Sequence, residues 1–199
     1  MIFIPISKLY DLLLFPFLNK IRKLTARIIL QLNPNNVIDI CCGTGNQLKF
    51  LTNSGINLMG IDNSNQMLKA AKGINCDIQD ARNIQFSKNS FDLALIQLAL
   101  HEKPVEDQKQ IIDEAYRIIN NSGHLLIVDY EISKDTKVHA RRIINSIEFL
   151  AGKEHYRNFK EFHKNQCTQN IISKSQFTLE KKLLVAGKSI SIQVFKKVS

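Results

Sequence analysis

With 199 residues, of which 44% are hydrophobic and 23% charged, the sequence is long and apolar enough for one globular domain, which excludes a disordered or low-complexity chain. The net charge of +9 is uneven: residues 1–36 carry five basic residues and one acidic residue, residues 37–130 eight and eleven, and residues 131–199 fourteen and six. The four cysteines have neither Cys-x-x-Cys spacing nor a histidine cluster beside them, so we expect no metal site and a reducing, cytoplasmic environment.

Residues 1–30 are apolar and predict a helical flap at the start of the domain. Lys8 and Asp11 interrupt the apolar run, two prolines break it, and no small-residue cleavage site follows. These features argue against both a signal peptide and a membrane-spanning helix. Together with the basic ends of the chain, the flap suits peripheral contact with a membrane surface; an ordinary solvated surface is the simpler reading of the same charges.

Between residues 37 and 130, runs rich in Val, Ile and Leu alternate with segments of helical periodicity. This alternation predicts a parallel sheet covered by helices on both faces. Residues 46–54 and 64–72 predict short helices, with Ser64 as the N-cap of the second; residues 105–120 predict the clearest helix, which we expect to end before Gly123. The predicted strands are residues 37–41, 57–61, 74–78, 92–97 and 124–129.

The pattern changes after residue 130. Residues 136–151 and 155–172 predict two helices, the second with one buried stripe. Two apolar runs around Gly187, within residues 177–195, predict a closing antiparallel hairpin. We therefore expect a three-layer α/β sandwich in a single domain: flap 1–30, ligand-binding half 37–130, and helical insert with β-hairpin 131–199. The stripe comprises Tyr156, Phe159, His163, Cys167 and Ile171.

A glycine turn follows the first predicted strand, where open α/β sheets bind their ligands. Gly43 and Gly45 permit positive φ and let a ligand approach the backbone. The dinucleotide fingerprint Gly-x-Gly-x-x-Gly is not completed, because position 48 is Leu. The turn alone therefore does not predict a dinucleotide site.

Three carboxylates lie at or just beyond consecutive strand ends: Asp39, Asp62 and Asp80. A pyrophosphate among them would be repelled, which also argues against an NAD-dependent oxidoreductase. A ligand with an ammonium group, a sulfonium and a ribose diol would be attracted and hydrogen-bonded. S-adenosylmethionine is such a ligand.

Four segments, in this order and spacing, resemble the class I S-adenosylmethionine-dependent methyltransferases, especially the ubiquinone and menaquinone biosynthesis branch. They read VIDICCGTGNQ, GIDNSNQMLKAA, CDIQDARNIQF and FDLALIQLALHE. The resemblance covers roughly residues 8–130. It implies a Rossmann-like, seven-stranded sheet of order 3-2-1-4-5-7-6 whose last strand is antiparallel, and S-adenosylmethionine as the cofactor.

The resemblance also implies roles in cofactor binding. Asp39 would orient the loop and the methionine ammonium group, and Asp62 would chelate both ribose hydroxyls. Asp80 would accept a hydrogen bond from the adenine amino group. The other residues implied to border the cofactor are Tyr10 in the flap, Cys42, Gly43 and Gly45 in the first loop, Asn63 and Met67 beside the adenine, Ala81 at a ring nitrogen, and Gln97 and Leu98 toward the substrate chamber.

Each of these residues also has a purely structural interpretation. Asp39 could cap the loop amides, Asp62 could cap the following helix and Asp80 could be a turn aspartate. Met67 could fill the core and Tyr10 could simply pack. The sequence alone leaves these alternatives open.

Methyl transfer requires chiefly that the acceptor be aligned and water excluded, so no protein nucleophile is expected. The first candidate for a general base is His101, after the fourth strand, with Glu102 as its neighbour; His101 could instead close the loop structurally. Tyr130, His155 and Tyr156 could line the acceptor pocket.

The predicted acceptor is a small molecule. Bases alternate with aromatics in KEHYRNFKEFH, but helical periodicity explains them as one amphipathic face, so nucleic acid is not expected. The absence of an NPPY-like tetrapeptide after the fourth strand argues against methylation of exocyclic amino groups. We predict methyl transfer to a quinone precursor or another apolar ring compound; the alternative is a regulatory protein that binds the cofactor without turnover.

Overall fold

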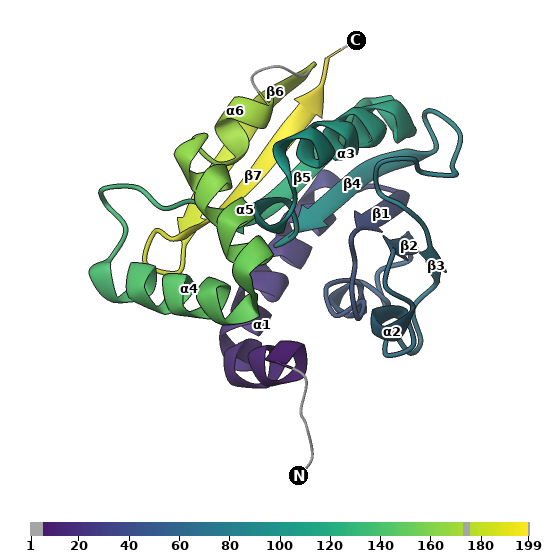
Figure 1. The fold of residues 1–199 in the computed structure, drawn as a ribbon. Coiled ribbons are helices and arrows are strands. Elements are labelled where there is room, and N and C mark those ends of the chain that lie inside the picture. Colours follow the sequence, from purple (N-terminus) through teal and green to yellow (C-terminus); the bar gives the residue numbers. More distant parts are fainter. Residues whose placement is uncertain (1–5, 173–175, 199) are drawn as a thin grey trace.

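A seven-stranded mixed sheet forms the centre of the computed structural model, which describes residues 6–172 and 176–198, with side chains described from residue 18 onward (Figure 1). The strand order is β3-β2-β1-β4-β5-β7-β6. Strands β1 to β5 run parallel, whereas β7 pairs antiparallel with both β5 and β6. The predicted order and antiparallel hairpin are thus confirmed. The strands are β1 (Asn36–Ile40), β2 (Asn57–Asp62), β3 (Cys76–Ile78), β4 (Phe91–Gln97), β5 (Ile119–Tyr130), β6 (Phe177–Val185) and β7 (Ile190–Lys197).

Helices cover both faces of the sheet, as the apolar strands require. In the described residues the α-helices are α1 (Ile6–Leu32), α2 (Asn65–Leu68), α3 (Val105–Ile118), α4 (Val138–Ala151), α5 (Lys153–Lys164) and α6 (Thr168–Ile172), with 3₁₀ turns η1 (Leu48–Phe50) and η2 (Leu100–Glu102). None of these helices is both long enough and apolar enough to cross a bilayer.

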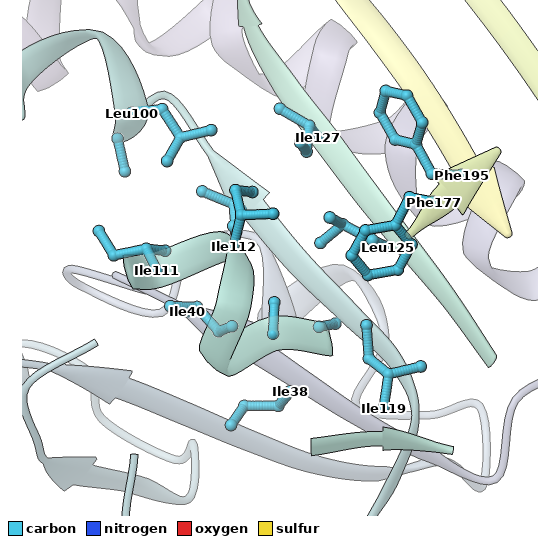
Figure 2. Close-up of a cluster of buried hydrophobic side chains, with 14 of the residues drawn as sticks. Ile38, Ile40, Leu100, Ile111, Ile112, Ile119, Leu125, Ile127, Phe177 and Phe195 are labelled. Atoms are coloured by element: carbon cyan, nitrogen blue, oxygen red, sulfur yellow. The ribbon is translucent and has the colours of Figure 1, made fainter. Parts of the chain in front are cut away.

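The central strands divide their side chains between two cores because successive residues of a strand point to opposite faces. Even-numbered residues of β1 and β4, such as Ile38 and Ile96, pack with α3 and α6 (Figure 2). Odd-numbered residues, such as Val37 and Leu95, pack with α1 and α4. All four of these side chains are fully buried, which explains why the strands read as continuous apolar runs rather than as alternating ones.

The first half of the chain departs from the predicted elements in two places. Residues 46–54 contain only the 3₁₀ turn η1 and turns, not an α-helix. Gly123 does not follow the end of α3, because β5 begins immediately at Ile119 and includes this glycine. Ser64 caps α2 as predicted: its hydroxyl accepts a hydrogen bond from the Met67 N–H at 3.3 Å.

The predicted helix over residues 155–172 is wrong as a single element. It is divided into α5 and α6, because Gln166 and Cys167 adopt positive φ angles of 62° and 56°. The break changes the buried stripe: His163 is exposed, whereas Phe162 is buried. Periodicity alone gave no sign of this break.

Gly60 in β2 allows two cysteines to pack against the strand. A Cβ at this position would lie 2.7 Å from Cys42 Sγ and 2.8 Å from Cys76 Sγ. We expect Gly60→Ala to lower the free energy of unfolding by about 1–3 kcal/mol, measured by urea denaturation. In a background with alanine at both cysteines the loss should shrink by about half or more, since the clashing atoms are gone; an equal loss in both backgrounds would contradict this explanation.

Candidate functional site: a cofactor cavity at the carboxyl end of the sheet

A cavity of about 570 Å³ opens beyond the carboxyl ends of β1, β2 and β4, within the usual size range of small-molecule sites. Most of the residues that the sequence singled out for the cofactor lie in its wall: Asp39, Cys42, Gly43, Asp62, Asn63, Met67, Asp80, Ala81, Gln97 and Leu98. Gly45 is buried outside the wall, where a Cβ would touch Ala71 and Ile74. Tyr10 lies within α1, and its side chain is outside the described residues.

Asp62, the last residue of β2, ties together two loops of the cavity. Its Oδ2 accepts from the Gly43 N–H at 2.9 Å, and its Oδ1 accepts from the Ser64 N–H at 2.8 Å. Each carboxylate oxygen can accept a second hydrogen bond, so both remain able to bind a pair of hydroxyls. Gly43 has a positive φ of 54°. Cys41, two residues before it, also has a positive φ, of 62°. Backbone held in this region is typical of ligand-binding turns.

Asp39 is a buried acid with an unused acceptor. The side chain is 1% exposed, and its Oδ1 has no hydrogen-bond partner among the described residues. Burial first, and then repulsion by Asp62, raise its pKa to about 8, against the opposing attraction of Arg22. An unpaired buried acceptor is costly, so its position on the cavity wall suits a ligand cation such as an ammonium group.

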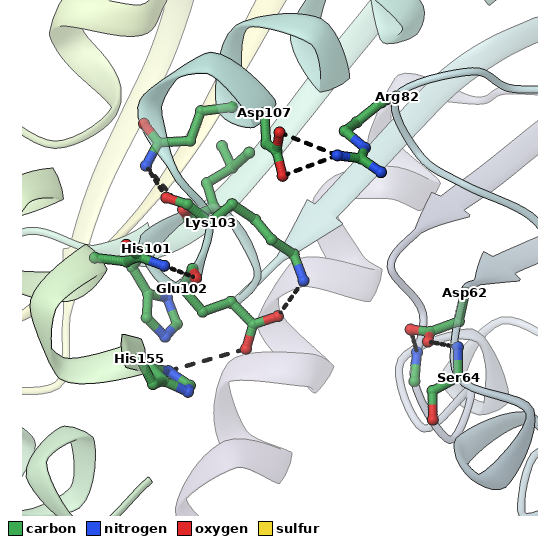
Figure 3. A network of polar contacts seen from close by, with 12 residues as sticks. Asp62, Ser64, Arg82, His101, Glu102, Lys103, Asp107 and His155 are labelled. Atoms are coloured by element: carbon green, nitrogen blue, oxygen red, sulfur yellow. Dashed lines mark hydrogen bonds and ion pairs between the residues drawn. The ribbon is translucent and has the colours of Figure 1, made fainter. Parts of the chain in front are cut away.

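Asp80 is paired with a neighbouring cation, which the sequence analysis did not anticipate. Its two oxygens accept from Arg82 Nε and Nη2, the latter at 2.7 Å. Arg82 also contacts Asp107, as Figure 3 shows. Hydrogen bonds from Arg82 lower the Asp80 pKa below its usual range. Any adenine contact from Asp80 would therefore share this carboxylate with Arg82.

The end of β4 forms the wall beside these acids. Leu98 has a φ of 53°, and its N–H donates to the Val128 carbonyl at 2.7 Å. Gln97 Oε1 is buried with no hydrogen-bond partner among the described residues. A strained backbone beside an unused acceptor indicates a second point where a ligand can bind.

His101 lies in η2 and lines the cavity, but it is buried rather than placed at the mouth. Its Nδ1 donates to Asp129 Oδ1 at 2.6 Å, and its Nε2 lies 3.6 Å from Glu148 Oε2. Burial alone would lower its pKa, but Asp129, Glu148 and Glu102 together raise it to about 9. The raised pKa opposes the predicted role of His101 as a neutral general base.

Two partners of His101, Asp129 and Glu148, were missed by the sequence reasoning. Asp129 is fully buried and also accepts from the Leu100, His101 and Tyr130 N–H groups. Asp129 lies near the end of a strand, as Asp62 does, and this position could have identified Asp129 as a candidate from the sequence. Glu148 is 1% exposed, and its Oε1 accepts from the Tyr130 hydroxyl at 2.8 Å. Nothing in the helical pattern of α4 marks Glu148 as different from a surface acid.

His155 completes the group from α5. Its Nε2 lies 2.8 Å from Glu148 Oε2 and 3.9 Å from Glu102 Oε2, and the side chain lines the cavity as predicted. Tyr130 lies behind the cavity wall and contacts the His101 ring at 4.5 Å between centroids. Tyr156 stacks on Phe159 and is not part of the wall. Figure 3 shows His101 and His155 close together, across from Asp62.

Comparison with known proteins supports the class that this fold and cavity define. Residues 38–127 match the sequence model of a methyltransferase domain. Solved structures of similar fold include the plantazolicin methyltransferase BpumL in complex with S-adenosylhomocysteine, with a TM-score of 0.67, 16% identity and coverage of 98% of this chain and 89% of that one. Residues 38–127 thus resemble a methyltransferase domain in sequence, and the chain shares its fold with solved methyltransferases.

Among curated proteins, the chain is similar to the demethylmenaquinone methyltransferase of Thermotoga maritima, at 31% identity over 134 residues. The match spans 62% of this chain and 58% of that protein's own length. A carboxy-S-adenosyl-L-methionine synthase of Campylobacter jejuni is 24% identical over 167 residues, which cover 79% of this chain and 71% of that protein. The first of these two relatives confirms the resemblance to the menaquinone branch.

Proposed function

We propose that this chain transfers the methyl group of S-adenosylmethionine to a small-molecule acceptor. The observation that carries the proposal is the pair of acids at the first two strand ends. Asp62 presents two anchored carboxylate oxygens, and Asp39 presents a buried, unused one in the same cavity. A ribose diol and an ammonium group are the ligand groups that such acceptors bind.

The positively charged side chains of the wall do not favour a phosphate. Arg82 is paired with Asp80 and Asp107, and Lys103 with Glu102 Oε1 at 2.7 Å. Arg22 acts on Asp39 and lowers its pKa. Each cation therefore already faces an acid, which leaves no evident site for a pyrophosphate.

S-adenosylmethionine supplies a methyl group on a sulfonium, which is activated for in-line displacement by the acceptor. The chain's own residues would hold the reactants and exclude water. Asp62 would bind the ribose hydroxyls, Asp39 the ammonium group, and Gln97 with Leu98 would separate the cofactor from the acceptor chamber. His101, whose Nδ1 is held by Asp129, would contact the acceptor and help to position it.

The acceptor side of the cavity suits a compound that is apolar but carries an oxygen. Its wall includes Leu18, Ile111 and Ile147 beside the His101 group. The similarity to demethylmenaquinone methyltransferases supports a quinone precursor or related ring compound as the acceptor. Peripheral membrane contact and a cytoplasmic location stay predictions, and so does a single domain over 1–199.

The alternative, a regulatory protein that binds the cofactor without turnover, shares the same cofactor residues. What favours an enzyme is the acceptor chamber itself, because a binding protein has no use for a buried histidine between two carboxylates next to the cofactor.

The test is transfer of labelled methyl from S-adenosylmethionine, with the protein incubated with lipid and quinone-precursor extracts. We expect label in an extractable acceptor and formation of S-adenosylhomocysteine. If the protein binds the cofactor but no extract, polar or apolar, acquires label, the non-catalytic alternative is correct.

A further inference from the structure

Two imidazoles and a carboxylate converge at the acceptor side of the cavity. His101 comes from η2, Glu148 from α4 and His155 from α5, and all three line the same cavity. One nitrogen or oxygen from each of the three side chains lies within 4.8 Å of the other two. The sequence gave no sign of this group, since the three residues are far apart along the chain.

The contacts inside the group are not those of a satisfied ion-pair network. Glu148 Oε2 and His155 Nε2 approach to 2.8 Å, yet both atoms are buried without a hydrogen bond of good geometry among the described residues. His101 Nε2 lies 3.6 Å from Glu148 Oε2, too far for a hydrogen bond. The ligand-type atoms of all three side chains therefore lie near one position, with Glu148 and His155 in direct contact.

We propose that His101 Nε2, Glu148 Oε2 and His155 Nε2 bind one divalent transition-metal ion of the zinc or iron(II) class. Two histidines and one carboxylate, with positions left open for substrate, are the ligand set of catalytic zinc and of non-haem iron sites. Metal–ligand bonds of about 2.0–2.2 Å at tetrahedral angles would hold the ligand atoms about 3.3 Å apart. The distances of 2.8 and 3.6 Å lie on either side of this value.

Groups behind the ligands orient them in the way that metal sites require. Asp129 Oδ1 accepts from His101 Nδ1 at 2.6 Å, which directs the Nε2 atom at the proposed ion. The Tyr130 hydroxyl donates to Glu148 Oε1 and leaves Oε2 free for coordination. Carboxylate–histidine pairs and hydrogen-bonded carboxylate ligands of this kind are usual behind bound metals.

Charge also favours a dication at this position. Asp129 and Glu148 are both almost fully buried and face the two imidazoles. Together these two carboxylates carry two negative charges, which a divalent ion would balance. Lys103 does not supply the missing charge, because it pairs with Glu102.

The role of the ion rests on the proposed function. Bound at the acceptor side, it would hold the acceptor by an oxygen atom opposite the cofactor. The acceptor class would then be one with a hydroxyl or carbonyl oxygen on its ring or next to it, consistent with a quinone precursor but narrower than any apolar ring compound.

Metal binding can be measured without any assay of methyl transfer. Full-length protein without an affinity tag, freed of metal with a chelator, is titrated with Zn²⁺ by calorimetry and with Co²⁺ by visible absorption. We expect about one ion per chain and a d–d absorption band of nitrogen and oxygen ligation. No uptake at millimolar metal would overturn the proposal.

Variants then locate the site. His155→Ala and Glu148→Gln should each weaken metal binding at least about 10-fold, whereas His163→Ala, which removes the exposed histidine of the same helix, should leave it unchanged. Equal affinity in the His155 and His163 variants would overturn the proposal. Binding of S-adenosylhomocysteine by every variant checks the fold and the cofactor site separately; metal binding without cofactor binding would refute only the proposed function.

Discussion

Replacing Asp62 by alanine is expected to weaken the binding of both S-adenosylmethionine and S-adenosylhomocysteine by at least ~100-fold. The change would remove the two charge-assisted hydrogen bonds that we propose between Asp62 and the ribose, each worth about 1.5–3 kcal/mol. It also releases the Gly43 and Ser64 N–H groups, which Asp62 holds in position in the free protein. Calorimetric titration of the variant gives the loss directly.

Two further variants separate ribose binding from a general loss of charge. Asp77→Ala removes an exposed acid from the neighbouring strand β3 and should leave cofactor affinity within about 2-fold, since surface charges contribute little. His101→Ala should cost less affinity than Asp62→Ala, because His101 faces the acceptor. Similar losses at positions 62 and 101 would show that the role given to His101 is wrong.

Asp39→Asn is expected to stabilise the free protein at pH 8 while lowering its affinity for the cofactor about 10-fold or more. Burial raises the Asp39 pKa to about 8, so ionising this side chain in the folded protein is unfavourable. Asparagine has nearly the same shape and cannot ionise. The substitution also removes the negative charge of Asp39, with which a bound ammonium group would pair.

The pH dependence follows from the direction of this shift. Between the ordinary aspartate pKa of 3.8 and about 8, the folded state holds a proton at Asp39 that the unfolded chain releases. Stability from this group is therefore full below pH 3.8 and is lost as the pH rises toward 8. Asp62 and Arg22 face the same carboxyl and act in opposite directions on it.

Urea denaturation of the wild-type protein and Asp39→Asn at several pH values measures this effect, because other titrating groups cancel in the difference. The free energy of unfolding of the variant, relative to that of the wild type, should increase by about 1–3 kcal/mol between pH 5 and pH 8. A constant difference over this range would mean that Asp39 is not the buried, proton-holding group described above.

The centre of the sheet could be predicted from sequence because strands such as β1 and β4 are buried on both faces. Runs such as residues 92–97 have few other possible structures, and the hairpin at Gly187 is a local signal. The helices after residue 130 were less predictable. The break at Gln166 and Cys167 depends on packing of α5 and α6 against different parts of the molecule, which periodicity cannot reveal.

The cofactor side of the site was predictable for a similar reason. Asp39 and Asp62 lie at the ends of strands, and the carboxyl ends of parallel strands meet at one edge of the sheet. The pairing of Asp80 with Arg82 was not predictable, because it depends on side-chain conformation in a loop. The convergence of Glu148 and His155 on His101 was not predictable either, because the packing of α4 and α5 alone creates it.

Titration of the full chain with S-adenosylhomocysteine, S-adenosylmethionine and NAD⁺ tests most directly whether the acids at the sheet's open end bind a nucleoside with an amino-acid tail in preference to a pyrophosphate. We expect the first two to bind at one site per chain with micromolar affinity, and NAD⁺ at least ~100-fold more weakly, since the described cations Arg82 and Lys103 of the cavity wall are already paired with acids. Binding of NAD⁺ as tight as that of S-adenosylhomocysteine, or no binding of either sulfur compound at millimolar concentration, would contradict this account.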